Sequence, residues 1–169
     1  MSDVMPPLNF KLTDEQGKTV TEKDYVGKAT LLFFGYTHCP DVCPTTLARL
    51  TSIIRQLDPA LRDKIQILFV SVDPARDTPK MLASYTSAFG PEVVGLTGDK
   101  AELADITNRF RITYSYGEPD QDGNYTVTHS GAVFAFDRQG DPTFMVIQSD
   151  PTSDVKADIT HLIEAGMNG

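Results

Sequence analysis

The stretch FFGYTHCPDVCPTTLARL, residues 33–50, decides how the rest of the sequence is interpreted. Its first two residues complete the apolar run at residues 31–34. Such a continuous run is typical of a strand buried on both faces of a parallel sheet. Gly35 ends that run, and Pro44 suits the first turn of a helix, where its missing N–H would have no partner anyway. Apolar residues then recur at helical spacing. We therefore predict a strand over residues 29–34 and a helix over residues 44–57, joined by a loop.

The only two cysteines of the chain, Cys39 and Cys43, lie in this loop. Their spacing keeps both sulfurs within reach of one metal ion or of each other. If Cys43 lies in or just before the first helical turn, we expect the helix dipole to lower its pKa and favour the thiolate. The alternative, two small buried hydrophobic residues, is disfavoured by the nearby prolines and by Thr37, His38 and Asp41. The pair indicates a redox-active dithiol or part of a metal site.

Composition limits the class of protein. A chain of 169 residues, 40% hydrophobic and 22% charged, fits a single soluble globular domain over residues 1–169, with about the first seven residues as a flexible start. A domain of this size does not need a disulfide for stability, so the cysteines are better explained by function. The net charge of −8 speaks against binding to nucleic acid or directly to an anionic membrane surface.

No stretch of the sequence approaches the ~20 apolar residues of a membrane span, and the N-terminus lacks the pattern of a signal peptide. One interpretation left open is that the chain is the soluble part of a membrane-anchored protein.

A second strand and helix repeat the first pattern. Residues 65–72 are predicted as another buried strand, and in the loop VDPARDTP that ends it either Asp77 or Thr78 can cap the next helix. The apolar face of that helix is predicted to comprise Met81, Leu82, Tyr85 and Phe89. This order of elements is a βαβ unit with parallel strands. Both loops then lie at the carboxyl edge of the sheet, where open α/β folds bind ligands.

The remaining segments complete an α/β fold. We predict a β-hairpin before the first strand and a hairpin or excursion at the edge of the site in the polar stretch GEPDQDGNY, residues 117–125. The other predicted elements are a short strand over 93–96, a helix over 100–110, strands over 132–136 and 143–147, and a last helix over 152–165.

The three histidines are candidates for a further metal ligand. His129 stands just before the predicted strand 132–136, and it can reach the cysteine loop only if that strand lies beside the first one. From the pattern alone, a surface or hydrogen-bonded role is the simpler interpretation. His38 is interpreted as a supporting or solvent-facing residue, because it points away from its neighbour Cys39 in an extended segment. His161, near the end of the last helix, is given no role in the site.

The loop expected to face the cysteines carries two further charged candidates. We predict that Asp73 is a supporting carboxylate near the metal or the thiols, whereas Arg76 is more simply interpreted as a surface cation. Tyr114, Tyr116 and Phe134 could shield the site, although aromatic residues on strands more often belong to the core.

Three segments together resemble a known family. GYTHCPDVCP at 35–44, VSVDPARDTP at 70–79 and YTVTHS at 125–130, in this order and at these distances, closely resemble the Sco/SenC family, and the resemblance extends over about residues 8–165. It implies a thioredoxin-like fold: a central mixed β-sheet flanked by helices, with an N-terminal β-hairpin and an inserted hairpin or loop before the ligand histidine. It also implies copper binding and a part in assembling the CuA centre of cytochrome c oxidase.

The resemblance also implies a location and a ligand set. Family members are tethered by an N-terminal helix, so we expect the periplasmic side of the bacterial inner membrane or, alternatively, the mitochondrial inner membrane facing the intermembrane space. The metal ligands carried over from the family are Cys39, Cys43 and His129. Thr128 stands where family members often have an acidic residue, which we expect to affect the surroundings of the histidine and the relative affinities for the two copper states.

The chemistry of these residues is consistent with one copper ion per chain. Thiolates prefer Cu(I), whereas an imidazole suits either oxidation state. Structural zinc would require four protein ligands, and the sequence offers no evident fourth. Copper, as Cu(I) or Cu(II), is therefore the expected cofactor.

Two functions from different classes remain open. The first is a monomeric metallochaperone-type protein whose partner is the oxidase subunit that carries the CuA site, with another copper chaperone or a thioredoxin-like reductant as a further candidate partner. The second is a dedicated thiol-disulfide oxidoreductase in which Cys39 and Cys43 reduce the cysteines of the recipient copper site. His129 discriminates between them, because a thiol reductase has no need of it. A thiol peroxidase is disfavoured by the proline-flanked pair.

Overall fold

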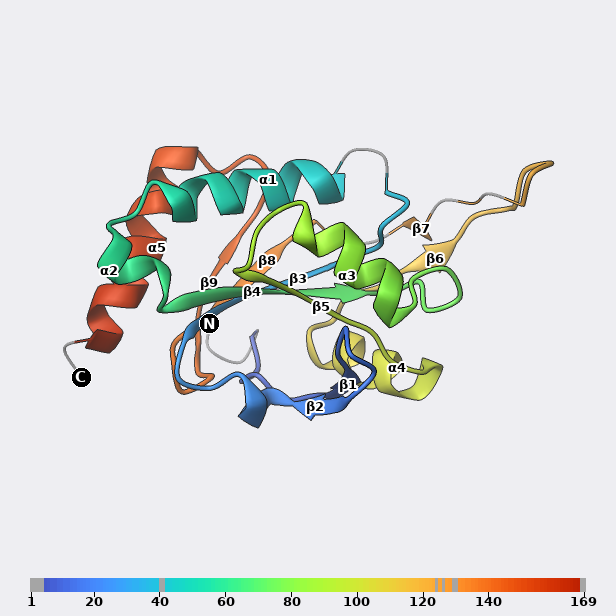
Figure 1. Ribbon diagram of the computed structural model, residues 1–169, viewed down its shortest axis with the longest axis horizontal. Coiled ribbons are helices and arrows are strands. Elements are labelled where there is room, and N and C mark those ends of the chain that lie inside the picture. Colours follow the sequence, from blue (N-terminus) through green and yellow to red (C-terminus); the bar gives the residue numbers. More distant parts are fainter. Residues whose placement is uncertain (1–4, 40–41, 124, 126, 129–130, 168–169) are drawn as a thin grey trace.

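The computed structural model describes residues 5–39, 42–123, 125, 127–128 and 131–167, and within them the chain is built around a five-stranded sheet (Figure 1). The strand order is β5–β4–β3–β8–β9, in which β3, β4 and β5 are parallel to one another and β8 and β9 are antiparallel. The strands are β3 (Ala29–Gly35), β4 (Ile65–Ser71), β5 (Val93–Leu96), β8 (Val133–Phe136) and β9 (Pro142–Val146).

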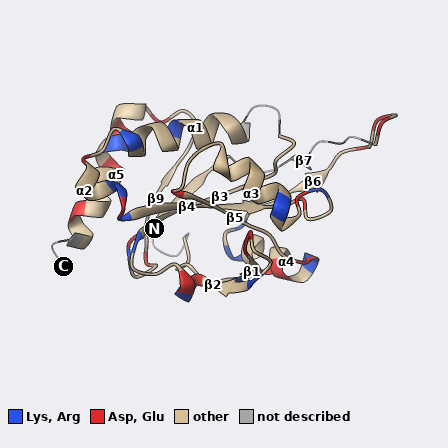
Figure 2. Cartoon of the chain, in the orientation of Figure 1, with Lys and Arg blue, Asp and Glu red and all other residues tan. Residues whose placement is uncertain are grey.

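The two central strands are buried along their whole length, because helices cover one face of the sheet and a hairpin and a helix cover the other. On β3, Leu31 and Phe33 pack into the cluster under the helices, and Leu32 and Phe34 pack into the opposite cluster. Each large apolar side chain buried in this way contributes about 1.5–3 kcal/mol. Neither strand carries a charged residue (Figure 2). The predicted continuous apolar strands are confirmed.

Three helices line one face of the sheet, and the N-terminal hairpin and one helix line the other (Figure 1). The first face holds α1 (Val42–Arg55), α3 (Pro79–Ser87) and α5 (Thr152–Met167), and the short α2 (Pro59–Arg62) follows α1. The second face holds β1 (Lys11–Thr13), β2 (Thr19–Thr21), the 3-10 turn η2 (Glu22–Asp24) and α4 (Lys100–Arg109). The expected βαβ unit and N-terminal hairpin are therefore confirmed.

The start of α3 settles which residue caps it. Thr78 is the N-cap, and its hydroxyl accepts a hydrogen bond from the backbone N–H of Met81 at 3.3 Å. Asp77, the other candidate cap, points elsewhere. The prediction that Met81 belongs to the apolar face of this helix is wrong, since 47% of Met81 is exposed while Leu82 is fully buried. The buried face is centred on Leu82 and Thr86, and Met81 lies at its rim.

The predicted hairpin at the edge of the site is also present. Strands β6 (Ser115–Tyr116) and β7 (Val127–Thr128) pair antiparallel and project beyond the central sheet (Figure 1). The segment 117–123 between them is exposed and carries three acidic residues (Figure 2). None of the helices described for this chain is both long enough and apolar enough to cross a membrane.

Candidate metal and dithiol site

The cysteine loop lies at the carboxyl edge of the parallel strands. The last residue of β3, Gly35, pairs with Ser71, the last residue of β4, so the loops that follow both strands leave the sheet together. Both cysteines are free thiols; Cys43 is fully buried in the first turn of α1, and Cys39 is partly buried. The backbone N–H of Cys43 donates to Sγ of Cys39 at 3.4 Å. The predicted placement of the pair at the junction of strand and helix is confirmed, but the helix begins at Val42, earlier than predicted, and includes Cys43.

The surroundings of Cys43 are apolar. An added Cβ on Gly35 would lie only 2.6 Å from Sγ of Cys43 and 2.8 Å from the ring of Phe69, so the glycine leaves the space in which the sulfur sits. Burial raises the pKa of the Cys43 thiol well above its ordinary value, although a hydrogen bond with the backbone of Tyr36 acts in the opposite direction. The expected lowering by the helix dipole is wrong, because removing water from a thiolate costs more than the dipole returns.

The unequal exposure of the two thiols predicts unequal reactivity. At pH 8, iodoacetamide is expected to alkylate Cys39 about tenfold faster than Cys43, because Cys43 is both enclosed and held in the thiol form. Mass spectrometry of digests taken at intervals from the reduced, metal-free protein measures both rates. Equal rates would contradict the burial of Cys43.

For His129 to reach the cysteines, the strand after position 129 must lie beside the first strand, and the structure meets this condition. β8 pairs with β3, and its first residue, Val133, lies opposite Phe33 near the end of β3. The chain therefore enters β8 at the same edge of the sheet from which it leaves β3 toward Cys39. His129 itself lies outside the described residues.

Asp73 is buried and accepts hydrogen bonds from two side chains. Its Oδ2 accepts from Nε of Arg76 at 2.5 Å, and its Oδ1 accepts from the hydroxyl of Tyr125 at 2.7 Å. The interpretation of Arg76 as a surface cation is wrong, since its side chain is only 16% exposed and its guanidinium lies 3.6 Å from the centre of the Tyr125 ring. The two charges of the loop thus pair with each other and with the hairpin.

Asp77 is the functional candidate that sequence reasoning missed. It is fully buried, and its carboxylate accepts from the backbone N–H of Thr37 at 2.9 Å, from the Thr37 hydroxyl at 2.6 Å and from the Ser71 hydroxyl at 2.6 Å. The sequence offered one indication: both Asp77 and Thr78 could cap α3. Because a helix needs only one N-cap residue, the other was available for a different role. Asp77 therefore joins the cysteine loop to the end of β4.

His38 is half-exposed beside this carboxylate. Its Nδ1 lies 3.3 Å from the Thr37 hydroxyl and 3.9 Å from Oδ1 of Asp77, as expected for a supporting residue at the surface. His38, Asp73 and Asp77 each bring one potential ligand atom within 4.8 Å of the others. Both carboxylates already accept hydrogen bonds from other side chains: Asp77 from Thr37 and Ser71, and Asp73 from Arg76 and Tyr125.

The aromatic candidates divide between the core and the hairpin. Phe134 is buried in the apolar cluster, as the structural interpretation predicted. Tyr116 is half-exposed, and its hydroxyl donates to the backbone carbonyl of Val72 at 2.5 Å. The rings of Tyr114 and Tyr125 both contact Tyr116 edge-on. The tyrosines thus fasten the hairpin to the loop after β4.

Tyr85, on α3, was predicted only as part of an apolar face. Its ring stacks on Phe69, which also packs beside Cys43. Its hydroxyl is buried, and no hydrogen-bond partner for it occurs among the described residues. Burial, followed by the electrostatic influence of Cys43 and Cys39, raises the pKa of Tyr85. The hydroxyl therefore stays protonated close to the thiols.

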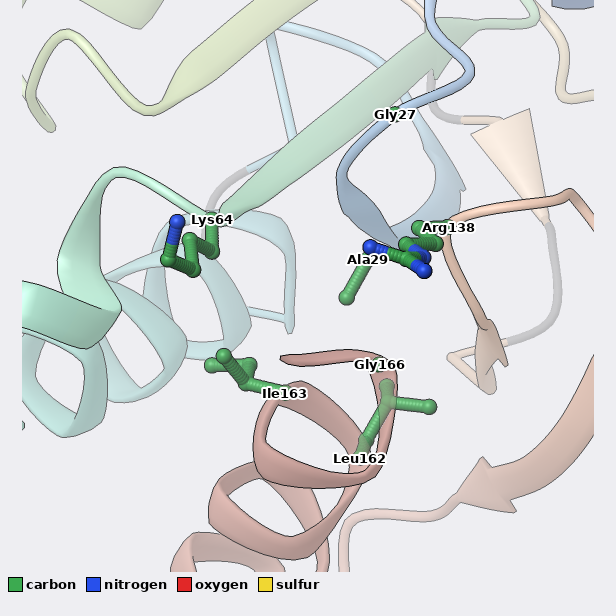
Figure 3. A pocket seen from close by; sticks show the side chains of 7 residues that line it. All are labelled: Gly27, Ala29, Lys64, Arg138, Leu162, Ile163 and Gly166. Carbon is green, nitrogen blue, oxygen red and sulfur yellow. The ribbon is translucent and has the colours of Figure 1, made fainter. Parts of the chain in front are cut away.

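Two pockets help to delimit the site. One lies at the start of β3, where Ala29, Lys64 and Arg138 line it together with the end of α5 (Figure 3), and it is therefore at the opposite end of β3 from the cysteines. The described residues that line it carry neither a sulfur nor an imidazole. A second, smaller groove runs beside the first turns of α1 and is lined by Thr45, Thr46, Arg49, Val133, Val146 and Ile147. This groove adjoins the helix turn that holds Cys43.

Comparison with known proteins gives consistent matches over nearly the whole chain. The SCO1/SenC family model matches residues 6–164. The mitochondrial SCO1 homolog of Homo sapiens is 36% identical over 156 residues, which make up 90% of this chain and 52% of that protein. The chain spans about half the length of the curated relatives it matches.

Two solved structures extend the likeness to the fold. ScoI of Bradyrhizobium japonicum with copper bound is 40% identical, with a TM-score of 0.81 over 92% of this chain and 98% of that chain. Yeast Sco1 with copper bound is 31% identical, with a TM-score of 0.84 over 95% of this chain and 90% of that chain. These matches confirm the expected thioredoxin-like fold. Together with the family match, they show that this chain belongs to the SCO1/SenC family.

Proposed function

We propose that the chain binds one copper ion through Cys39, Cys43 and His129 and helps to assemble the CuA site of cytochrome c oxidase as a metallochaperone-type protein. The observation that carries this proposal is the dithiol itself, which lies at the edge of the sheet where the chain enters β8. The copper-bound relatives support the choice of metal. We further propose that residues 1–169 form one domain that acts as a monomer on the periplasmic side of the bacterial inner membrane or, alternatively, in the mitochondrial intermembrane space.

The chemistry of the donor set supports copper. Two thiolates are soft ligands suited to Cu(I), and a neighbouring imidazole suits Cu(II) as well. The raised pKa of Cys43 does not oppose this, because a bound metal ion replaces the proton of the thiol. The described residues contain one other group of three potential ligands, His38, Asp73 and Asp77, and hydrogen bonds already engage its carboxylates.

Copper titration of the reduced protein beside its His129→Ala variant tests the proposal. The unaltered protein is expected to bind one copper ion, and the variant to lose at least about tenfold in Cu(II) affinity while both thiols still titrate. Metal analysis gives the stoichiometry, and visible absorption and EPR report Cu(II)–thiolate and nitrogen ligation. If both proteins bind Cu(II) alike, the histidine is not a ligand.

The alternative function is a dedicated thiol-disulfide oxidoreductase that reduces the recipient's cysteines, and one observation favours it. Cys39 is accessible while Cys43 is enclosed behind it, which is the arrangement expected of an attacking and a resolving thiol. Reduction of an oxidised peptide that carries the recipient's two cysteines, at equal rates by the unaltered protein and the His129→Ala variant, would favour this function.

A further inference from the structure

We infer that the loop between β4 and α3, residues 72–78, binds the cysteine loop on one side and the β6–β7 hairpin on the other, and so holds these two segments together. We call residues 72–78 the bracket loop. By joining these two segments it fixes Tyr125 and the tyrosine of β6, Tyr116, relative to the loop that leads to the thiols. The inference rests on the proposed function, because it concerns the approach of the third ligand to the two cysteines.

On the cysteine side, the bracket loop acts through Asp77. This carboxylate accepts both hydrogen bonds that Thr37 can donate, from its backbone N–H at 2.9 Å and from its hydroxyl at 2.6 Å. Thr37 stands two residues before Cys39. A buried carboxylate that accepts several hydrogen bonds is a strong anchor, because each donor would otherwise be left without a partner. The cysteine loop is therefore fixed to the bracket loop.

On the hairpin side, the bracket loop accepts hydrogen bonds from one tyrosine in β6 and from another that precedes β7. The Tyr116 hydroxyl, from β6, donates to the carbonyl of Val72 at 2.5 Å. The Tyr125 hydroxyl, just before β7, donates to Asp73 at 2.7 Å. Burial and the hydrogen bond to Asp73 raise the pKa of Tyr125, so this hydroxyl remains a donor across the physiological range. Tyr116 in β6 and Tyr125, two residues before β7, are therefore both attached to the bracket loop.

Arg76 connects the two sides. Its Nε pairs with Asp73 at 2.5 Å, and its guanidinium lies 3.6 Å from the centre of the Tyr125 ring and 5.7 Å from that of Tyr36. Tyr36 belongs to the segment that leads into the cysteine loop. Cation–π contacts of a partly desolvated arginine add to the ion pair. The same side chain therefore contacts the hairpin and the start of the cysteine segment.

The reach of the chain turns these attachments into a constraint on the third ligand. Position 129 is four residues after Tyr125, a length of chain that spans about 14 Å at most when fully extended. Tyr125 is fixed to Asp73 and β7 is paired with β6, so the described part of the chain that leads to the proposed third ligand is held at two points. The tyrosine is thus a positioning residue, which acts on copper binding through the hairpin.

The experiment compares Cu(II) binding by the full chain and by its Tyr125→Phe variant, which removes the hydroxyl and keeps the ring over Arg76. Cu(II) affinity is expected to fall about tenfold, with altered nitrogen features in the EPR spectrum, because the imidazole is held less well. Tyr116→Phe, at a half-exposed residue whose loss of a hydroxyl leaves the core intact, is expected to act in the same direction. Tyr25→Phe, which removes the same atom beside the N-terminal hairpin, is the control and is expected to bind like the unaltered protein.

Combination with His129→Ala identifies the route of the effect. If Tyr125 acts by positioning the histidine, Tyr125→Phe causes no further loss of Cu(II) affinity in the His129→Ala background. The same tenfold loss in both backgrounds, or no loss in the single variant, overturns the inference while the proposed ligand set stands. If His129→Ala alone binds Cu(II) like the unaltered protein, the proposed ligation is wrong and the inference is overturned with it.

Discussion

Replacement of Asp77 by alanine is expected to lower the free energy of unfolding of the reduced, metal-free protein by about 3 kcal/mol. The carboxylate is fully buried and accepts three hydrogen bonds from Thr37 and Ser71. Alanine has no acceptor atom in its side chain, so all three donors lose this partner. One of them is a backbone N–H beside the cysteine loop, where few alternative partners are available. Urea unfolding followed by circular dichroism measures the change, with the slope of the transition checked for two-state behaviour.

Two matched variants show whether the hydrogen bonds are responsible. Asp77→Asn retains one acceptor oxygen, and the hydroxyls of Thr37 and Ser71 can reorient toward its amide, so we expect a loss of only about 1 kcal/mol. Asp58→Ala removes an exposed carboxylate that makes no capping hydrogen bond at the start of α2, and its effect should stay within about 0.5 kcal/mol. A loss for Asp77→Ala no larger than that for Asp58→Ala would contradict the role assigned to Asp77.

Replacement of Gly35 by alanine is expected to cost about 2 kcal/mol of stability and to weaken copper binding as well. The new Cβ would lie 2.6 Å from Sγ of Cys43 and 2.8 Å from a ring carbon of Phe69, and both neighbours are fully buried. Neither can move away without displacing the core, so the sulfur must shift from its place in the first turn of α1. Thermal unfolding of the metal-free protein and Cu(I) competition with a chelator measure the two effects.

Gly166→Ala provides the control for this substitution. Gly166 lies in α5, and an added Cβ would meet only the Arg138 side chain at the ordinary contact distance of 3.6 Å. Alanine is the better helix former, so this variant should be as stable as the unaltered protein or more stable by up to about 1 kcal/mol. If Gly35→Ala also leaves stability and copper affinity unchanged, the close packing of Cys43 against the end of β3 is incorrect.

The sequence predicted the parts of the fold that depend on local patterns. β3 and β4 consist of uninterrupted runs without a charge, and buried parallel strands require such runs. The N-terminal hairpin follows from its polar turn, where Asp14 accepts from the backbone of Gln16 and Lys18. Thr78 was one of two capping candidates for α3, and both had the right side chain. In each case the determining residues lie within a few positions of one another.

What the sequence did not predict depends on contacts between distant segments. Asp77 is a buried anchor because Thr37, forty residues earlier, lies next to it. Arg76 is buried because the hairpin brings Tyr125 over it. The pKa of Cys43 is raised because packing against β3 and β4 removes water, an effect that the helix dipole, the only influence visible from local sequence, does not reveal. No periodicity or motif in the sequence indicates which of these distant residues come into contact in the folded chain.

If the chain carries copper on both thiols, as proposed, their unequal enclosure imposes an order on the release of the ion. An incoming thiolate from a recipient protein has access from the side of Cys39, while the core closes the side of Cys43. In the proposed transfer, a copper ion held by both thiols would be passed on by stepwise ligand exchange, with the bond to Cys39 replaced early and the bond to Cys43 broken last. The ion would then not become free in solution, and the rate of transfer would be governed by how readily the first turn of α1 releases the sulfur of Cys43.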